Sequence, residues 1–264
     1  MTLDPADLEH AGLRLDVDAA GQVATVTLNR PRRRNAMTPS MWRGLASVGA
    51  ALPPEVRIVV VRGEGVSFSA GIDLRLFSAE GIPDEGPLPD LRADDFPPWI
   101  ASMQAGFTWL RDPRIISIAA VRGHAIGAGF QLALSCDLRV AADDATFCMK
   151  EPALGLVPDL TGTKPLVDIV GLPRALEMCV TARTVDATEA ARLRLAEFVV
   201  PSAGLDAAVA DLSAALLATD PATARATKRL LSLAPGHTLE QQAAAEGRMQ
   251  GELARERFGS LSAD

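Results

Sequence analysis

Two stretches decide how this chain folds: GHAIGAGFQLALSCD at Gly123–Asp137 and SFSAGIDL at Ser67–Leu74. Each joins an apolar run to a turn of small residues, which lets backbone N–H groups approach a ligand closely. Two such turns side by side could polarise one carbonyl oxygen. One helical turn past the second, where a carboxylate would give an acid–base catalyst, the chain has Gln131. The pair therefore predicts an oxyanion hole that lacks its neighbouring acid.

Composition narrows the function classes. A length of 264 residues suits one domain with a helical appendage, and the net charge of −7 argues against nucleic-acid binding. Three cysteines without CxxC spacing predict no disulfide framework. The N-terminus lacks the features of a signal peptide, and no apolar run reaches membrane-spanning length. We expect a cytoplasmic protein that contacts neither membranes nor nucleic acids.

The order of elements indicates an α/β fold with a parallel sheet. Segments 12–17 and 22–28 flank a turn and predict a hairpin, and a helix follows Thr38 as its cap. Residues 57–63 and 115–121 are continuous apolar runs, typical of strands covered on both faces. Two further short strands are expected near DLRVAA and TFCMK. Strands that alternate with helices in this way favour a parallel sheet over a series of hairpins.

The second half of the chain is expected to be mainly helical. A Pro-rich and acidic insertion at 76–98 precedes it and is typical of a functional loop. We expect a core over residues 1–200 and a helical region over residues 201–264. The candidate helices cover 173–182, 188–195, 205–218, 221–233 and 238–257, with a strand at 197–200.

Several common motifs are absent from the sequence. The run Gly127-Ala128-Gly129 begins like a dinucleotide fingerprint, but Leu132 stands where the third glycine is required. No GxxxxGK[ST] or GxSxG motif occurs, and the three histidines are widely separated. The sequence therefore predicts neither a nucleotide-binding loop, nor a serine hydrolase, nor a metal site.

Four segments in order resemble the enoyl-CoA hydratase/isomerase (crotonase) superfamily. They are TLNRPRRRNAM at 27–37, VVVRGEGVSFSAGIDL at 59–74, AVRGHAIGAGFQLALSCDLRVA at 120–141 and TFCMKEPALGLVPD at 146–159. The similarity covers most of the chain. It implies the crotonase spiral of ββα units, followed by a helical C-terminal region that forms homotrimers. Two such trimers can pair as a hexamer.

The resemblance also implies site residues. In the family, the amides at the positions of Ile72 and Ala128 form the oxyanion hole for an acyl-CoA thioester. Unpaired N–H groups at a helix start fit that role for Ala128. Coenzyme A is then part of the substrate, and no metal or redox cofactor is expected. The matching CoA-binding positions are Arg32, Arg34, Asn35, Ala36, Ala70, Gly71, Asp73, Leu74 and Gly127, with Lys228 and Phe258 expected to reach the CoA of a neighbouring subunit.

The acid–base residues leave alternatives open. Family hydratases carry two glutamates, whereas this chain has Gln131 at the first position and Glu151 at the second. We expect Gln131 to face the same site as Ala128, because residues three apart share a helix face, and to orient water or substrate without exchanging protons. Asp159 matches an aspartate that transfers protons in some family isomerases. A helix expected to begin near Leu160 also allows Asp159 to be an N-cap.

One carboxylate suffices to move a double bond, whereas adding water usually requires a second group. The sequence thus favours an isomerase with Glu151 as the proton shuttle. The alternatives are an enoyl-CoA hydratase that uses a single glutamate and a non-catalytic subunit that only binds acyl-CoA.

Overall fold

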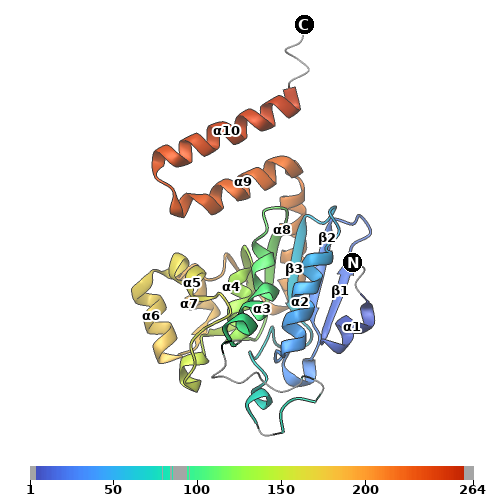
Figure 1. Ribbon diagram of the computed structural model, residues 1–264, viewed down its shortest axis with the longest axis vertical. Coiled ribbons are helices and arrows are strands. Elements are labelled where there is room, and N and C mark those ends of the chain that lie inside the picture. The colour runs from blue at the N-terminus through green and yellow to red at the C-terminus, as the bar shows by residue number, and fades with distance from the viewer. Residues whose placement is uncertain (1–3, 79, 84, 86–93, 95, 259–264) are drawn as a thin grey trace.

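The computed structural model describes residues 4–258 except 79, 84, 86–93 and 95. Within these residues the large sheet has six strands in the order β1-β2-β3-β4-β6-β9 (Figure 1). They are β1 (Leu13–Val17), β2 (Val23–Leu28), β3 (Ile58–Gly63), β4 (Ile116–Val121), β6 (Leu138–Ala142) and β9 (Phe198–Val200). β1 pairs antiparallel with β2 and every other neighbouring pair is parallel. The predicted hairpin and parallel sheet are confirmed.

A second, smaller row of extended segments lies beside this sheet. It contains β5 (His124–Ile126), β7 (Thr146–Cys148) and β8 (Val185–Asp186). Isolated parallel bridges join Met37 to Ile72 and Ser69 to Ala125. Along the chain, a long strand of the large sheet is thus repeatedly followed by a short extended segment of the second row. This repetition is the expected spiral of ββα units.

Helices follow these passes. They are α1 (Pro5–His10), α2 (Pro39–Ala51), α3 (Phe96–Thr108), α4 (Ala128–Ser135), α5 (Thr163–Val170), α6 (Leu172–Thr181), α7 (Ala187–Arg192), α8 (Leu205–Leu217), α9 (Pro221–Leu233) and α10 (Leu239–Phe258). α2 begins as predicted, because the Thr38 side chain accepts a hydrogen bond from Met41 N–H at 3.2 Å.

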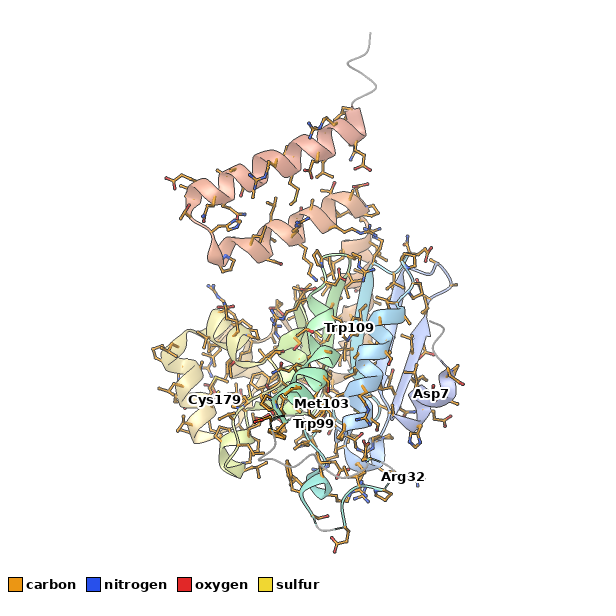
Figure 2. All side chains as sticks on the ribbon, viewed as in Figure 1. Asp7, Arg32, Trp99, Met103, Trp109 and Cys179 are labelled. Atoms are coloured by element: carbon orange, nitrogen blue, oxygen red, sulfur yellow. The ribbon has the colours of Figure 1, made fainter. Side chains whose placement is uncertain are left out.

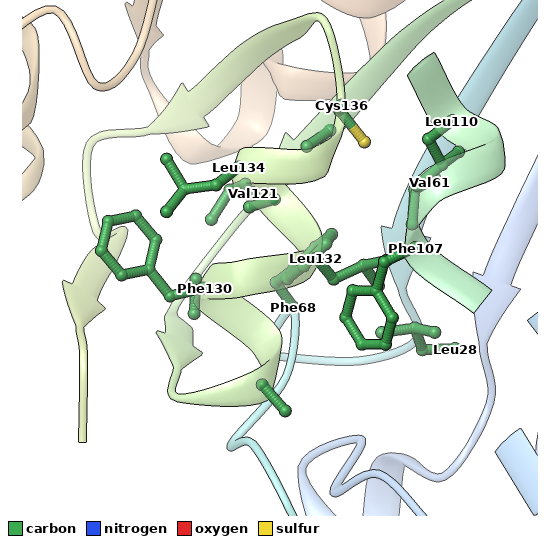
Figure 3. Packing of buried hydrophobic residues seen from close by; sticks show 14 of the residues in the cluster. Leu28, Val61, Phe68, Phe107, Leu110, Val121, Phe130, Leu132, Leu134 and Cys136 are labelled. Carbon is green, nitrogen blue, oxygen red and sulfur yellow. The ribbon is translucent and has the colours of Figure 1, made fainter. Parts of the chain in front are cut away.

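The main core lies between the large sheet and helices α2, α3 and α4. Leu28 and Val61 from the sheet pack near Phe107 of α3 and Leu132 of α4 (Figure 3). All four side chains are fully buried. α4 is buried along its whole length, which fixes its amino end firmly.

The C-terminal helices divide into two kinds. α8 packs on the opposite sheet face, where Leu205 and Val209 join a second apolar cluster. α9 and α10 pair with each other and project from the body of the molecule (Figure 1). The expected division near residue 200 stays a prediction. In the described part of the chain no single helix could cross a membrane by length and composition, although the bent pair 202–217 and 221–236 passes that test together.

The insertion predicted at 76–98 falls partly outside the described residues. Its first residues belong to a 3₁₀ turn, η2 (Leu74–Phe77), and its last belong to α3. Trp99 and Met103 of α3 lie near the middle of the view in Figure 2, and Arg32 lies to the lower right. Leu76 at the start of the insertion and Met103 just after its end are buried.

Candidate active site

The first small-residue turn directs the N–H of Ile72 away from its pairing partner. Met37 N–H donates to Gly71 O at 2.7 Å, and Asp73 N–H donates to Met37 O at 2.8 Å. In parallel pairing of this kind, the residue between the two bonded ones turns its own N–H to the opposite side. The N–H of Ile72 therefore faces away from Met37, and Ile72 lines the cavity described below.

The second turn connects β5 to α4. Gly127 has φ +52° and ψ −120°, a backbone conformation that residues with a Cβ rarely adopt. Its N–H donates to Cys148 O at 2.8 Å, which ties the turn to β7. Ala128 is the first residue of α4, so its N–H has no partner within the helix. The helix dipole adds positive potential at this point.

The two turns can touch because glycine, which has no side chain, stands at their contact points. A Cβ on Gly71 would lie 2.6 Å from Ile126 O and 3.6 Å from Ala128 N, which puts the two proposed donors close together. A Cβ on Gly129 would lie 2.7 Å from Ser69 Cβ. The sequence suggested that the glycines around Ala128 clear a path for a thioester. Gly129 instead makes room for Ser69, and a Cβ on Gly127 would lie 3.2 Å from Glu151 Oε1.

Both turns open into one cavity of about 460 Å³. Ile72, Ala128, Glu151 and Asp159 all line it, as do Ala70, Gly71, Leu74 and Gly127. Its far walls are apolar and come from α2, η2 and α3, namely Trp42, Leu76, Phe77, Phe96, Trp99 and Ile100. The described ends of the insertion, in η2 and α3, thus form part of the cavity wall. Cavities of this size and apolarity hold small-molecule ligands.

Glu151 lines this cavity, and one of its carboxylate oxygens has no hydrogen-bond partner among the described residues. It begins the 3₁₀ turn η4 (Glu151–Leu154) and is only 8% exposed. Oε1 accepts a hydrogen bond from Gln131 Nε2 at 2.7 Å, whereas Oε2 is buried without a partner among the residues described. Burial raises the pKa of the Glu151 carboxyl and the charge of Asp159 raises it further, against the hydrogen bond from Gln131.

Gln131 does not face the cavity as the sequence suggested. Its side chain is fully buried and is not part of the cavity wall. Its Oε1 accepts hydrogen bonds from Leu160 N–H at 2.8 Å and Gly162 N–H at 3.1 Å. Since its Nε2 also donates to Glu151, both ends of the amide are engaged by the protein. The prediction that Gln131 orients water or substrate directly is wrong, because Gln131 lies behind Glu151.

Asp159 lies in the cavity wall and is not a helix cap. α5 begins at Thr163 with Gly162 as its N-cap, because Thr161 has φ +68° and interrupts any helix at 160. Gln104 Nε2 donates to Asp159 O at 2.6 Å and holds the segment from α3. Burial raises the pKa of the Asp159 carboxyl. The cap alternative is excluded, and Asp159 remains available as a second carboxyl group.

The loop at 32–36 is built around Asn35. Its Nδ2 donates to Glu64 O at 2.9 Å and Ser67 O at 2.8 Å, and its Oδ1 accepts from Arg30 N–H at 2.9 Å. Because this side chain is fully buried and occupied, it supports the loop and offers no group to a ligand. Arg32 and Arg34 are exposed, and Ala36 is half-buried. These three stay predictions for CoA binding.

Asp73 is held by two arginines. Its carboxylate lies 2.7 Å from Arg75 Nη2 and 3.0 Å from Arg30 Nη2. Hydrogen bonds from Arg75 and then from Arg30 keep the pKa of the Asp73 carboxyl well below its usual range. With its side chain 8% exposed, the carboxylate fixes the loop after Ile72 and is not open for the expected CoA binding. Leu74, by contrast, is 57% exposed at the cavity edge.

The two C-terminal candidates lie away from the cavity. Lys228 Nζ donates to Asp137 Oδ2 at 2.7 Å, Ile115 O at 2.8 Å and Asp112 O at 2.9 Å. These bonds use all three ammonium protons, so the expected reach to a neighbour's CoA has no free donor on Lys228. Phe258 ends α10 and is 52% exposed, with the Arg257 guanidinium 5.8 Å from its ring centre. Its contact with CoA stays a prediction.

Sequence reasoning missed the turn that holds Gln131. Leu160 and Gly162 supply backbone donors rather than side chains, and their partner is about thirty positions earlier. A Cβ on Gly162 would lie 2.6 Å from Gln131 Cγ, so this glycine is required by the contact. The isolated Gly162 was the only local signal.

Comparisons with known proteins identify the family of this chain. The family model described as Enoyl-CoA hydratase/isomerase matches residues 18–259. A protein from Thermobifida fusca YX, named as an enoyl-CoA hydratase and solved with acetoacetyl-CoA, is 58% identical with a TM-score of 0.93, covering 96% of this chain and 98% of that one. It was also solved with CoA.

Two curated relatives have different names. EchA8 of Mycobacterium bovis, named as an enoyl-CoA hydratase, is 32% identical over 70% of this chain and 68% of its own length. The peroxisomal Delta(3,5)-Delta(2,4)-dienoyl-CoA isomerase of Arabidopsis thaliana is 31% identical over 87% of this chain and 83% of its own. With the family model spanning nearly the whole sequence, this chain belongs to the enoyl-CoA hydratase/isomerase family and has the crotonase fold.

Proposed function

We propose that this protein moves a proton next to the carbonyl of an acyl-CoA thioester, with Glu151 as the base. The observation that carries the proposal is that Glu151, whose Oε2 is buried without a partner in the described part of the chain, lines the same cavity as Ile72 and Ala128. A carboxylate whose pKa is raised by burial is better suited both to take and to return a proton than one with an ordinary pKa.

The proposed reaction shifts a double bond. Glu151 Oε2 removes a proton from the carbon beside the thioester carbonyl of a 3-enoyl substrate, and the electron pair moves to the carbonyl oxygen. The amides of Ile72 and Ala128 stabilise this enolate oxygen, each donor being worth about 100- to 1,000-fold in rate. The same carboxyl group then delivers its proton two carbons away. Atoms and electrons balance without a metal ion or a redox cofactor.

Hydration of a 2-enoyl-CoA by the same glutamate is the second candidate. The names of the Thermobifida and Mycobacterium relatives favour it. Against it, Gln131 has no exchangeable acid proton and both of its ends are occupied. Asp159 would then have to hold the water. A subunit that binds acyl-CoA without reacting is the third reading.

Solvent-deuterium incorporation separates these readings. The protein is incubated in D₂O with saturated, 2-enoyl and 3-enoyl CoA thioesters, and mass spectrometry follows deuterium uptake, isomer and hydrated product. We expect uptake and 3-to-2 isomerisation, and Glu151→Gln should lower both by about 100- to 10,000-fold. Asp159→Asn is the matched control, since it removes the other cavity carboxyl. An undiminished rate in Glu151→Gln would contradict the assignment, and CoA binding without uptake would support the non-catalytic reading.

We also propose that the chain forms a homotrimer, or a hexamer of two trimers. Ala245 is the one buried residue that the described parts of α9 and α10 contain, while Leu231, Leu239 and Phe258 are exposed there. α6 exposes a stripe of Leu172, Leu176 and Val180. Exposed apolar surface of this extent is typical of an interface. Light scattering after gel filtration would measure the mass, and a monomer would contradict the proposal.

A further inference from the structure

The orientation of the Gln131 amide is determined by its neighbours. Amide oxygen and nitrogen are usually hard to tell apart and must be assigned from their partners. Here one end meets two backbone N–H groups, of Leu160 at 2.8 Å and of Gly162 at 3.1 Å, and these groups can only donate. That end must be the oxygen. The NH₂ end then faces Glu151 Oε1 at 2.7 Å and must donate to it.

The surroundings of Gln131 are shaped to keep it there. Gln131 sits in the first turn of α4 and is fully buried. Between its two backbone donors, Thr161 has φ +68°, an uncommon conformation for a residue with a branched side chain. This turn aims the N–H groups of Leu160 and Gly162 at one oxygen. A Cβ at Gly162 would displace the amide, because it would lie 2.6 Å from Gln131 Cγ.

The two oxygens of Glu151 are thereby made unequal. Oε1 accepts from an NH₂ group, which cannot take a proton in exchange. A proton on Oε1 would weaken the hydrogen bond from Gln131 Nε2, because the new O–H would compete with the N–H for the same space. Oε2 has no partner in the described part of the chain. We propose that Gln131 is a positioning residue that keeps Oε1 as a permanent acceptor, so that Oε2 alone takes and returns the substrate proton. This inference rests on the proposed function of Glu151.

The charges around Glu151 make this amide more suitable than a carboxylate. Asp159 and Lys150 border the same cavity, and the charge of Glu151 reaches Cys148 on β7 and Cys179 on α6. Burial and Asp159 disfavour the charged form of Glu151, and the neutral Gln131 donor opposes them. A glutamate at 131 would place an oxygen where Nε2 now lies, 2.7 Å from Glu151 Oε1. Two carboxylates that close cannot both ionise and must share a proton.

Gln131→Glu therefore tests the assignment without a change in side-chain size. The two backbone donors would keep the new carboxylate charged, and the shared proton would block Glu151. We expect the acidic limb of the pH profile for deuterium uptake to move up by more than about one pH unit. At neutral pH the uptake rate should fall at least about tenfold, because little of Glu151 would be the free base. The substitution should not create an efficient hydratase.

Gln131→Leu and Gln104→Leu form a matched pair. Both remove an amide that bonds to the backbone of the 159–162 segment, but only Gln131 touches Glu151. We expect Gln131→Leu to lower kcat by about tenfold with KM within about twofold, and to move the acidic limb upward, because a donor to the carboxylate is lost. Gln104→Leu should leave the acidic limb in place.

An infrared measurement keeps the inference testable apart from catalysis. At neutral pH, Gln131→Glu should show the C=O stretch of a protonated carboxyl group that Gln131→Glu with Glu151→Gln lacks. Absence of this band, or an acidic limb unchanged in both Gln131 variants, would overturn the positioning role. If instead Glu151→Gln alone retained uptake, the proposed function would fail while the band could still report the shared proton. The two failures are thus distinguishable.

Discussion

Two polar clusters lie at opposite ends of α4, and they differ in how completely their hydrogen bonds are satisfied. At the amino end, Glu151 has one oxygen bonded to Gln131 and one with no partner in the described chain. Beyond the carboxyl end, Asp137 Oδ2 accepts from Ser117 N–H at 2.8 Å, Ser117 Oγ at 3.1 Å and Lys228 Nζ at 2.7 Å. The second cluster leaves no donor of Lys228 unused.

This difference in hydrogen bonding suggests that the Asp137 cluster serves stability and that the Glu151 cluster serves chemistry. Buried polar groups in proteins are nearly always paired, so a buried carboxylate oxygen without a partner indicates a binding or catalytic role. The Asp137 cluster instead ties α9 to the starts of β4 and β6, because Lys228 belongs to α9. Under the proposed function, one helix thus carries a reactive cluster at one end and a structural cluster at the other. Substitutions at the two ends should have different consequences.

Among substitutions that leave both clusters intact, the largest expected effect is on activity, from Gly71→Ala. The new Cβ would lie 2.6 Å from Ile126 O at a residue with φ +88°, so the two turns must separate. Loss of one aligned donor should lower deuterium uptake by about 100- to 1,000-fold. Gly21→Ala is the control, because Gly21 has φ +72° with no atom within 4 Å of the added Cβ. A folded Gly71→Ala protein with an uptake rate near that of the unchanged enzyme would refute the two-turn oxyanion hole.

Lys228→Met should act on stability instead. It leaves Asp137 and the carbonyls of Ile115 and Asp112 without their cation, and we expect a loss of about 2 kcal/mol in the free energy of unfolding. Denaturant titration measures this loss. Lys164→Met is the control, because its partner Asp168 is exposed and such pairs contribute about 0.5 kcal/mol. A raised KM for CoA thioesters with unchanged stability would instead restore the sequence-based role of Lys228.

Features set by neighbouring residues could be predicted from the sequence. Thr38 caps α2 because cap and acceptor are three residues apart. Gly127 marks the start of α4 because its backbone conformation requires a glycine. The parallel sheet followed from apolar runs alternating with helices. The resemblance to the family then indicated that Ile72, Ala128 and Glu151 share a site, and all three line one cavity.

Features set by distant contacts could not be predicted. Gln131 turned away from the cavity because its partners, the N–H groups of 160 and 162, come from a later turn. Asp159 is no cap because Thr161 adopts a left-handed conformation that its residue type does not suggest. Lys228 looks like a ligand-binding surface lysine until Asp137, 91 positions away, is placed beside it. In each case the deciding partner is unknown until the chain is folded.

The smallest expected effect concerns the pH dependence of stability. Because the folded state raises the pKa of Glu151, the folded protein holds a proton that the unfolded chain has already released. Stability from this residue is present at low pH and is lost as pH rises through the folded-state pKa. Glu151→Gln removes the charge, so it should be more stable than the unchanged protein at neutral pH, by about 1 kcal/mol. The gain should shrink toward acidic pH.

Asp73→Asn should change the stability at neutral pH in the opposite direction, by lowering it. Arg75 and Arg30 lower the pKa of Asp73, so its contribution is present at neutral pH and lost as pH falls toward the folded-state pKa. Thermal unfolding across a pH series should therefore show Glu151→Gln above and Asp73→Asn below the unchanged protein at neutral pH, with both differences narrowing in acid. If Glu151→Gln were destabilising at every pH, its carboxylate would be a satisfied structural group like that of Asp137. The contrast between the two ends of α4 would then be lost.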